Sequence, residues 1–355
     1  MKKLNYLMMA AAMTLGLASC SQESNPGTPA EDNTKVEGGL IIKEVNAGGG
    51  FTQTGGKAGS YSNCSGIILY NNSSSSVTVK NIAIGMVPPS NAHATNDNYE
   101  NDVLVYENAD FIPILTGLWY HSGITVQPFS DVVIATKGAI DHTQVAPNAI
   151  NFANPDYYAM YDPESSFNLK SYYPTPDASI PTANYWKAAV YGSGTAWMLS
   201  MFSPNVVLFQ FPEGTDIAAY CADEANRYYE GGTRDAYNSN VCVKIPKTWV
   251  LDAMETFCIG RASKKRISAD LDAGNGLYLN KMMYSAYRNV DEKATVNYGD
   301  NINKLVYNYA DGVEGTTDPS GIDAAASVKN GAKIIYQDTN NSTADFHLRK
   351  GWSLK

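Results

Sequence analysis

The sequence predicts a mainly β fold, an antiparallel β-sandwich with long loop insertions and few short helices. Three observations support this fold class. Short runs of β-branched and aromatic residues recur along the chain, turn residues such as Asn71-Asn72-Ser73 and Pro88-Pro89 separate them, and helical periodicity is rare. Many short strands with this spacing are typical of an antiparallel sandwich.

The first expected strand covers residues 40–45, a β-branched run that is followed by three consecutive glycines. Apolar or alternating runs of strand length follow it at intervals, and turn residues bound most of them. We expect these further strands at residues 66–70, 77–87, 103–106, 123–126, 131–135, 206–211, 241–245 and 333–337.

Helical patterns are short and few. Residues 215–229 form one candidate, with Asp216 near its start, and residues 246–255 are expected to form a short helix or a turn. Residues 141–200 are rich in Asn, Pro, Tyr and Asp and lack regular periodicity. We interpret them as long loops or an insertion, and loops of this length are functional or partly disordered.

The N-terminal residues 1–19 have the pattern of a secretory signal. Lys2 and Lys3 precede an apolar stretch over residues 7–17, which is too short to span a bilayer. The segment ends in Leu17-Ala18-Ser19-Cys20, which resembles the lipobox of bacterial lipoproteins. The resemblance implies lipidation of the Cys20 thiol and cleavage just before it. The alternative is an ordinary cleaved signal followed by a chance cysteine.

A lipidated Cys20 makes the membrane a partner of the chain, because two or more acyl chains hold a protein firmly at a bilayer. Residues 20–38 are polar, contain Pro and Gly, and are expected to form a flexible tether. Residues 39–257 would form the sandwich, with the insertion around 141–200. Residues 258–355 would form a C-terminal extension that packs on it.

The charge of the chain argues against nucleic acid as a partner. Removal of residues 1–19 takes away two lysines and no acid, which leaves 24 Lys and Arg against 35 Asp and Glu. Nucleic acid binding requires a basic surface, so we expect none. Cys64, Cys221, Cys242 and Cys258 follow the anchor. They allow two disulfides or four buried thiols, and the sequence does not choose between these states.

Several short segments resemble the lamin-tail domain, an immunoglobulin-like sandwich. They are Ile42-Lys43-Glu44-Val45, Leu69-Tyr70-Asn71, Val133-Ile134-Ala135 after Pro128, and Val250-Leu251-Asp252-Ala253. The resemblance implies the immunoglobulin-like form of the predicted sandwich. Ile67-Ile68 depart from the pattern, because many lamin-tail domains carry acidic residues there.

The chain more closely resembles a family of Bacteroidota lipoproteins of unknown function that carry such a body. The resemblance rests on three segments that recur in order, namely residues 139–142, 245–253 and 338–346. It implies an outer-membrane protein, and it supplies no catalytic residue.

Aromatic residues in the irregular region are the strongest candidates for ligand contacts. Aromatic faces with polar tips stack on sugar rings or bind peptides at low entropy cost. The alternative is that they pack the long loops onto the sandwich. The candidates are Tyr157, Tyr158, Tyr172, Tyr173, Tyr185, Trp186 and Trp197.

Metal, cofactor and catalytic motifs are weak, and we expect no enzyme, no metal and no cofactor. Residues 270–276 imitate a calcium loop without its full ligand set, and the Asx-rich residues 96–102 could hold a hard cation. Asp141-His142 could be an acid–base pair, although a structural hydrogen bond at a loop start is the better interpretation.

We therefore expect a non-catalytic binding or accessory module that presents loops 141–200 to a glycan or a peptide. It could assist an outer-membrane nutrient-uptake receptor. Two other hypotheses stay open, namely a structural or adhesive subunit of a surface fibre and a hydrolase that uses carboxylates such as Glu164 or Asp177. Ser21-Gln22-Glu23-Ser24 partly resembles an export signal, which favours the cell surface over the periplasmic face.

Overall fold

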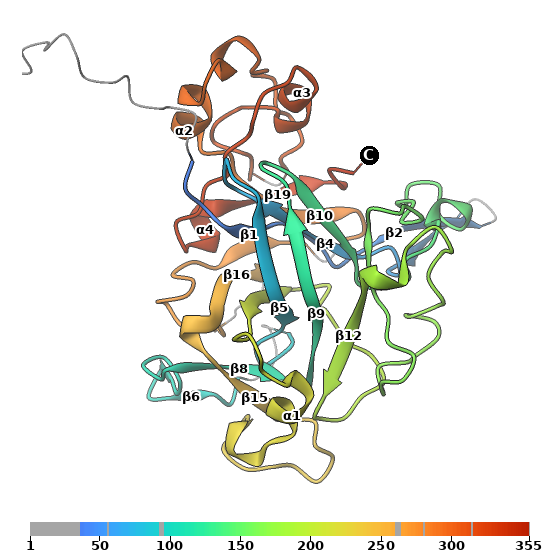
Figure 1. Ribbon diagram of the computed structural model, residues 1–355, viewed down its shortest axis with the longest axis vertical. Helices are drawn as coiled ribbons and strands as arrows, with labels where there is room; N and C mark the ends of the chain where they lie inside the picture. The colour runs from blue at the N-terminus through green and yellow to red at the C-terminus, as the bar shows by residue number, and fades with distance from the viewer. Residues whose placement is uncertain are drawn as a thin grey trace, which may run out of the picture. The chain divides into compact units, whose positions relative to one another are not determined.

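Twelve strands in the described part of the chain form one mixed sheet (Figure 1). The computed structural model describes residues 36–54, 57–91, 96–259, 264–279, 281–313 and 315–354. The predicted signal, Cys20 and most of the predicted tether lie outside these residues. The strands are β1 (Leu40–Asn46), β4 (Gly66–Asn71), β5 (Val77–Gly85), β9 (Gly117–Val126), β10 (Asp131–Ala135), β11 (Tyr158–Met160), β12 (Tyr185–Val190), β13 (Asn205–Gln210), β16 (Val250–Cys258), β17 (Gly276–Tyr278), β18 (Tyr284–Arg288) and β19 (Phe346–Lys350).

The strand order across the sheet is β17-β16-β13-β5-β9-β12-β11-β10-β4-β1-β18-β19. Most neighbours are antiparallel, while β10–β11, β11–β12 and β16–β17 are parallel. All six residues of β4 are buried, which explains its continuous apolar run, because a strand covered on both faces does not alternate. The predicted strands at residues 40–45, 66–70, 131–135 and 206–211 are thereby confirmed.

The predicted two-sheet immunoglobulin-like sandwich is wrong. Its two sheets would correspond to the groups β17-β16-β13-β5-β9 and β10-β4-β1-β18-β19, and these groups belong to one continuous sheet. The irregular region supplies the link. In that region β11 pairs with β10, β12 pairs with β9, and β11 and β12 pair with each other in parallel.

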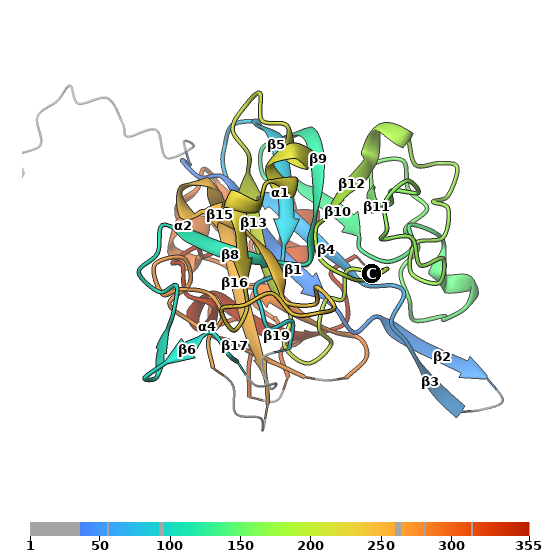
Figure 2. The ribbon, with the colours of Figure 1, turned by 90° about the horizontal axis from the view of Figure 1, so that it is seen from below.

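The sheet curls until its two end strands approach each other, so that it nearly closes on itself (Figures 1 and 2). Strand β17 contacts both β18 and β19. Tyr278 of β17 is fully buried, and its hydroxyl donates to the carbonyl of Tyr284 at 3.0 Å. The same hydroxyl accepts a hydrogen bond from the Ala47 N–H at 3.2 Å. The inside of the curl holds an apolar core that includes Ile84 and Trp119.

Smaller sheets pack beside the main sheet. Strands β8 (Phe111–Leu115), β15 (Val241–Pro246) and β14 (Arg227–Tyr229) form one of them, and the others are the hairpins β2–β3 (Gly50–Thr54, Lys57–Tyr61) and β6–β7 (Tyr99–Glu100, Val103–Leu104). Figure 2 shows the β2–β3 hairpin reaching away from the sheet. A second apolar core joins β15 to β13 and includes Val243 and Phe209.

The helices are short, as predicted. They are α1 (Ile217–Ala222), α2 (Glu292–Asn297), α3 (Ala324–Lys329) and α4 (Ser342–Asp345), with single 3-10 turns at His142–Gln144, Thr182–Asn184, Glu224–Asn226, Lys247–Trp249 and Asn301–Asn303. Asp216 caps α1 through a hydrogen bond from the Ala219 N–H. No helix in the described ranges has the length and apolar character needed to cross a bilayer.

Several of the predicted elements differ from the structure. Residues 246–255, expected as a short helix or a turn, form a 3-10 turn followed by the first part of β16. The predicted helix over 215–229 ends at Ala222, and its last residues form β14 instead. The predicted strand at 103–106 shrinks to the two residues of β7. Residues 333–337 make only a single bridge between Tyr336 and Val290, because they run over the outer face of the sheet.

Candidate functional site

A pocket of about 570 Å³ lies in the irregular region between β11 and β12. We call it the 161–175 pocket, because one continuous segment of the chain provides its whole wall. The lining residues are Tyr161, Asp162, Pro163, Phe167, Asn168, Lys170, Tyr173, Pro174 and Thr175.

Three anchors hold this segment against the sheet. At its start, the Asp162 carboxylate accepts a hydrogen bond from the Ala188 N–H of β12 at 3.0 Å. In its middle, the fully buried Phe167 packs on Trp119 of β9, with ring centroids 6.0 Å apart. Near its end, the Tyr173 hydroxyl accepts a hydrogen bond from the Trp197 N–H at 2.8 Å. The pocket wall is therefore fixed at both ends although the segment lacks regular structure.

The floor of the pocket is aromatic and its rim is polar. Phe167 and Tyr173 are buried, so Tyr161, which is partly exposed, is the more accessible aromatic residue of the wall. Asn168, Lys170 and Thr175 are exposed around it. An aromatic face beside amide, hydroxyl and ammonium groups binds ligands that combine an apolar surface with hydroxyl or carbonyl groups.

The structure brings only one of the seven predicted aromatic residues, Tyr173, to the wall of this pocket. Trp186 and Trp197 are buried in the main core. Tyr172 lies under the Lys137 ammonium, which is 4.5 Å from its ring centroid. These side chains mainly pack the loops onto the sheet, which was the alternative interpretation.

The other three predicted aromatic residues are partly buried and also contact internal partners. Tyr157 packs edge-on against Phe152, with centroids 6.4 Å apart, and Tyr158 packs against His121 at 5.4 Å. Tyr185 packs against Tyr161 at 5.5 Å, with their planes at 81°. Tyr185 thus supports the pocket ring from behind. Tyr161 was not among the predicted residues, because no local pattern distinguishes it from the other tyrosines of this region.

The carboxylates proposed for hydrolysis do not line the pocket. Glu164 is exposed beside it. Hydrogen bonds from Ser179 lower the pKa of Asp177, which therefore stays ionised and does not suit a general acid.

Asp141 and His142 have structural roles, as the sequence favoured. The Asp141 carboxylate accepts a hydrogen bond from the Thr143 N–H and caps a 3-10 turn. The buried His142 ring donates from Nε2 to the Gly138 carbonyl at 2.6 Å and accepts the Tyr61 hydroxyl at Nδ1 at 2.8 Å. A ring that is held at both nitrogens is not available as a base.

The two loops considered for cations also serve the fold. Asn101 and Asp102 have positive φ angles of 48° and 62°, and they form the tight turn of the β6–β7 hairpin. Asp272 is fully buried and accepts hydrogen bonds from Gly274 and Ser342. The described residues contain no group of three or more His, Cys, Asp and Glu that could hold a metal ion.

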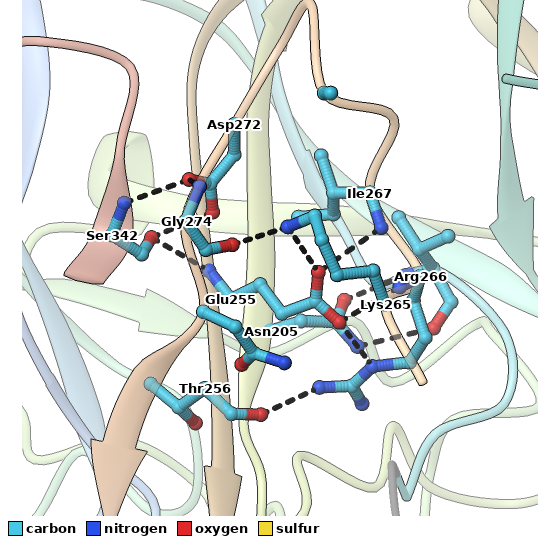
Figure 3. Close-up of polar contacts among 12 residues, drawn as sticks. Asn205, Glu255, Thr256, Lys265, Arg266, Ile267, Asp272, Gly274 and Ser342 are labelled. Carbon is cyan, nitrogen blue, oxygen red and sulfur yellow. Dashed lines mark hydrogen bonds and ion pairs between the residues drawn. The ribbon is translucent and has the colours of Figure 1, made fainter. Parts of the chain in front are cut away.

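A buried polar cluster lies around Glu255 of β16 (Figure 3). Its carboxylate accepts from the Arg266 Nε at 2.9 Å, from the Lys265 Nζ at 3.0 Å and from the Ile267 N–H at 3.2 Å. Glu255 and Arg266 are both fully buried. Gly274 belongs to this cluster because its carbonyl accepts a hydrogen bond from the Lys265 ammonium. A Cβ at this position would lie 2.1 Å from the Asn341 side chain.

This cluster is a structural clamp, because its hydrogen bonds connect backbone segments that are distant in sequence. The Arg266 guanidinium donates to the carbonyls of Ser203 and Thr256, each at 3.0 Å. No sequence motif predicted this cluster. The available signal was a charged residue, Glu255, within the otherwise apolar or neutral run of residues 253–258.

The fold and the pocket define a mainly β protein with one curled mixed sheet and a pocket in the insertion that links its two halves. The chain belongs to the DUF4876 family, described as a protein of unknown function, which matches residues 127–351. The predicted membership of a family of unknown function is thus confirmed, whereas its lipoprotein character stays a prediction.

The chain is similar to a solved structure of a DUF4876 family protein from Bacteroides thetaiotaomicron. The two share 22% sequence identity with a TM-score of 0.60, over 87% of this chain and 70% of that chain. At this identity the likeness concerns the fold alone. No match was found among curated proteins.

Proposed function

We propose that this protein is a non-catalytic, lipid-anchored module of the outer membrane that binds an oligosaccharide in the 161–175 pocket. Its role would be to assist a nutrient-uptake receptor at the cell surface. The single observation that carries the proposal is the pocket itself, whose volume of about 570 Å³ lies within the range of about 300–1,000 Å³ typical of small-molecule sites.

The chemistry of the wall favours a sugar. A pyranose has a CH face that stacks on an aromatic ring, and Tyr161 offers such a ring. Its hydroxyls both donate and accept hydrogen bonds. Asn168 and Thr175 do the same, while the Asp162 carboxylate accepts. A peptide could contact the Tyr161 ring equally well, but it would form hydrogen bonds with fewer of these polar side chains.

The arrangement of acids supports a binding role over hydrolysis. Glycoside hydrolysis commonly uses two carboxyl groups that flank the scissile bond. Asp162 is the one carboxylate on the described pocket wall. It also accepts two backbone hydrogen bonds, from Ala188 and Glu164, which anchor the segment. We therefore prefer a module that holds its ligand unchanged.

Replacement of Tyr161 by Ala tests the pocket. We expect the dissociation constant for an oligosaccharide selected from a glycan panel to rise about tenfold, which corresponds to the loss of one stacking contact. The measurement is isothermal titration calorimetry on the purified chain, with thermal unfolding to verify the fold. Tyr237→Ala is the matched control, because Tyr237 is 82% exposed and does not line the pocket.

Two outcomes would contradict the proposal. One is that no oligosaccharide in the panel binds at millimolar concentration while a peptide library does. The other is that Tyr161→Ala and Tyr237→Ala bind the selected sugar equally well.

The anchor is tested by Cys20→Ser. We expect this variant to leave the membrane fraction and enter the soluble fraction, because the lipid chains supply the membrane affinity. Detergent phase partitioning of whole-cell extracts measures it, with Ser24→Ala as the control. Membrane retention of Cys20→Ser would overturn the lipoprotein assignment.

The cell-surface position and the receptor are tested together on intact cells. Protease added to whole cells should remove the wild-type protein if it faces outward. Pull-down with the lipidated chain from detergent-solubilised membranes should recover an uptake receptor. Protection from protease, or recovery of no receptor, would contradict these parts of the proposal.

A further inference from the structure

A second cavity, of about 260 Å³, lies between the outer face of the sheet and α3. We call it the Lys43 cavity. It shares no lining residue with the 161–175 pocket. The sheet side contributes charged and aromatic groups, and α3 contributes small apolar side chains and one lysine. Its lining residues are Lys43, Tyr70, Phe129, Asp131, Tyr287, Ala324, Ala325, Val328, Lys329, Ile334, Tyr336 and Ser353.

A β-bulge places Lys43 in this cavity. The pairing register of β1 with β4 shifts between Ile42 and Glu44, so Lys43 is the extra residue. Lys43 is 7% exposed, which is unusual for a lysine. Its neighbour Glu44 is not a lining residue, and its carboxylate is occupied by Ser285 and Ser353.

The Lys43 ammonium is held by one carboxylate and three rings. Its Nζ lies 2.8 Å from both oxygens of Asp131. It also lies 5.3 Å, 5.9 Å and 5.5 Å from the ring centroids of Tyr70, Tyr287 and Tyr336. These contacts fix the ammonium in position, and an ammonium carries three N–H donors. Asp131 takes two of them, which leaves one donor for a ligand.

Three further residues of the wall, Tyr287, Tyr336 and Lys329, add donors that a ligand can use. The hydroxyls of Tyr287 and Tyr336 lie 2.9 Å apart and share one hydrogen bond, so one hydroxyl proton of this pair has no acceptor in the described part of the chain. Lys329 brings a second ammonium from α3. Two lysines against one aspartate give this cavity a positive lining in a chain of net charge −9.

We infer that the Lys43 cavity binds a small monocarboxylate. Its two carboxylate oxygens would accept from Lys43, from the Tyr287–Tyr336 hydroxyl pair and from Lys329. Its short apolar body would lie against Ala325 and the rest of the α3 wall. The volume is below the roughly 300 Å³ lower limit of drug-sized sites, which favours a ligand of a few carbon atoms.

The test uses butyrate as the probe on the full chain, with its neutral isostere butyramide and with inorganic phosphate. We expect butyrate to bind with a measurable heat or a saturable rise in melting temperature, and the other two not to bind. Ala325→Phe fills the cavity at an exposed position of α3, and we expect it to abolish butyrate binding.

Lys329→Gln should weaken butyrate binding roughly two- to fivefold, as expected for one exposed charge. Lys333→Gln is the matched control, because Lys333 is also exposed but does not line the cavity. Lys43→Met is not a sufficient test by itself. Loss of a buried charge can unfold the chain, and unfolding would also abolish butyrate binding.

Three results would overturn the inference. The first is that butyrate does not bind at about 10 mM. The second is that phosphate or butyramide binds as strongly as butyrate. The third is that a folded Ala325→Phe variant still binds butyrate. None of these results bears on the 161–175 pocket, so this inference and the proposed function fail independently.

Discussion

Replacement of Arg266 by Met is expected to lower the free energy of unfolding by about 3–5 kcal/mol, because it removes one partner of a buried ion pair. Arg266 and Glu255 are both fully buried. Without the guanidinium, the Glu255 carboxylate would stay in a low-dielectric environment with only Lys265 as a countercharge. A buried charge that loses its partner keeps its desolvation cost.

The guanidinium also donates to four backbone carbonyls from three separate segments. These carbonyls belong to Pro89, Ser90, Ser203 and Thr256. The segments around residues 89–90 and 203 are loops without sheet pairing. We expect that they lose their contact with β16 in the variant, and that this adds to the loss of unfolding free energy. Each buried carbonyl left unpaired costs about 1–3 kcal/mol before relaxation.

Urea unfolding measured by circular dichroism tests this prediction. Lys264→Met is the matched control. Its ammonium pairs with Asp102, but the two side chains are 49% and 93% exposed. An exposed pair of this kind contributes about 0–1 kcal/mol. A loss below 1 kcal/mol for Arg266→Met, equal to that of the control, would show that the cluster in Figure 3 does not clamp the fold.

The second large effect is acid destabilisation through His347 of β19. Burial lowers the pKa of its ring to about 3. Its Nδ1 donates to the Asn289 side-chain oxygen at 2.7 Å, and its Nε2 accepts from the Tyr309 hydroxyl at 2.5 Å. The second bond requires an unprotonated Nε2, and therefore the neutral ring, and the nearby Arg349 adds to the cost of a second positive charge.

The sign follows from proton uptake. The unfolded chain binds a proton at His347 near pH 6.5, while the folded chain resists it until about pH 3. The stability contributed by the neutral ring is therefore complete above pH 6.5 and falls as the pH decreases. Between pH 8 and pH 5 this single group costs about 2 kcal/mol of the unfolding free energy.

Glu230 acts in the opposite direction over part of the same range. Burial and the charge of Asp97 raise its pKa to about 7, so its contribution is complete below pH 4.5 and is lost as the pH rises through 7. The comparison must therefore be made between wild type and His347→Gln at each pH. We expect the variant to lose about 2 kcal/mol less than wild type between pH 8 and 5. Parallel curves for the two proteins would contradict this account of His347.

Local sequence patterns predicted the strands that are apolar and long. The runs at residues 66–70 and 206–211 form β4 and β13 because their burial is complete enough to appear as continuous hydrophobic sequence. The run at 333–337 has the same composition, but it packs on the outside of the sheet and makes one bridge. Composition therefore predicts which segments are buried better than it predicts which segments pair as strands.

The sheet topology could not be predicted from local sequence patterns. It depends on β11, which has three residues, and on parallel pairing between segments about 25 residues apart. A strand this short has no detectable periodicity, and parallel pairing leaves no turn signal in the sequence. Two separate sheets were expected because residues 141–200, interpreted as long loops or an insertion, were assigned no strand.

Aromatic content directed attention to residues 141–200, and the 161–175 pocket lies within this region. Of the seven predicted aromatic residues, Tyr173 lies on the pocket wall. Tyr158 and Tyr172 instead contact His121 and Lys137. Which ring remains accessible depends on long-range contacts such as that between Tyr161 and Tyr185.

The most direct test of the central claim is hydrogen exchange of the full chain with and without the selected oligosaccharide. The account predicts slowed amide exchange confined to residues 161–175 and the adjoining β11 and β12, with no change in α3. Slowed exchange elsewhere, with residues 161–175 unchanged, would contradict it and would place the binding site outside this pocket.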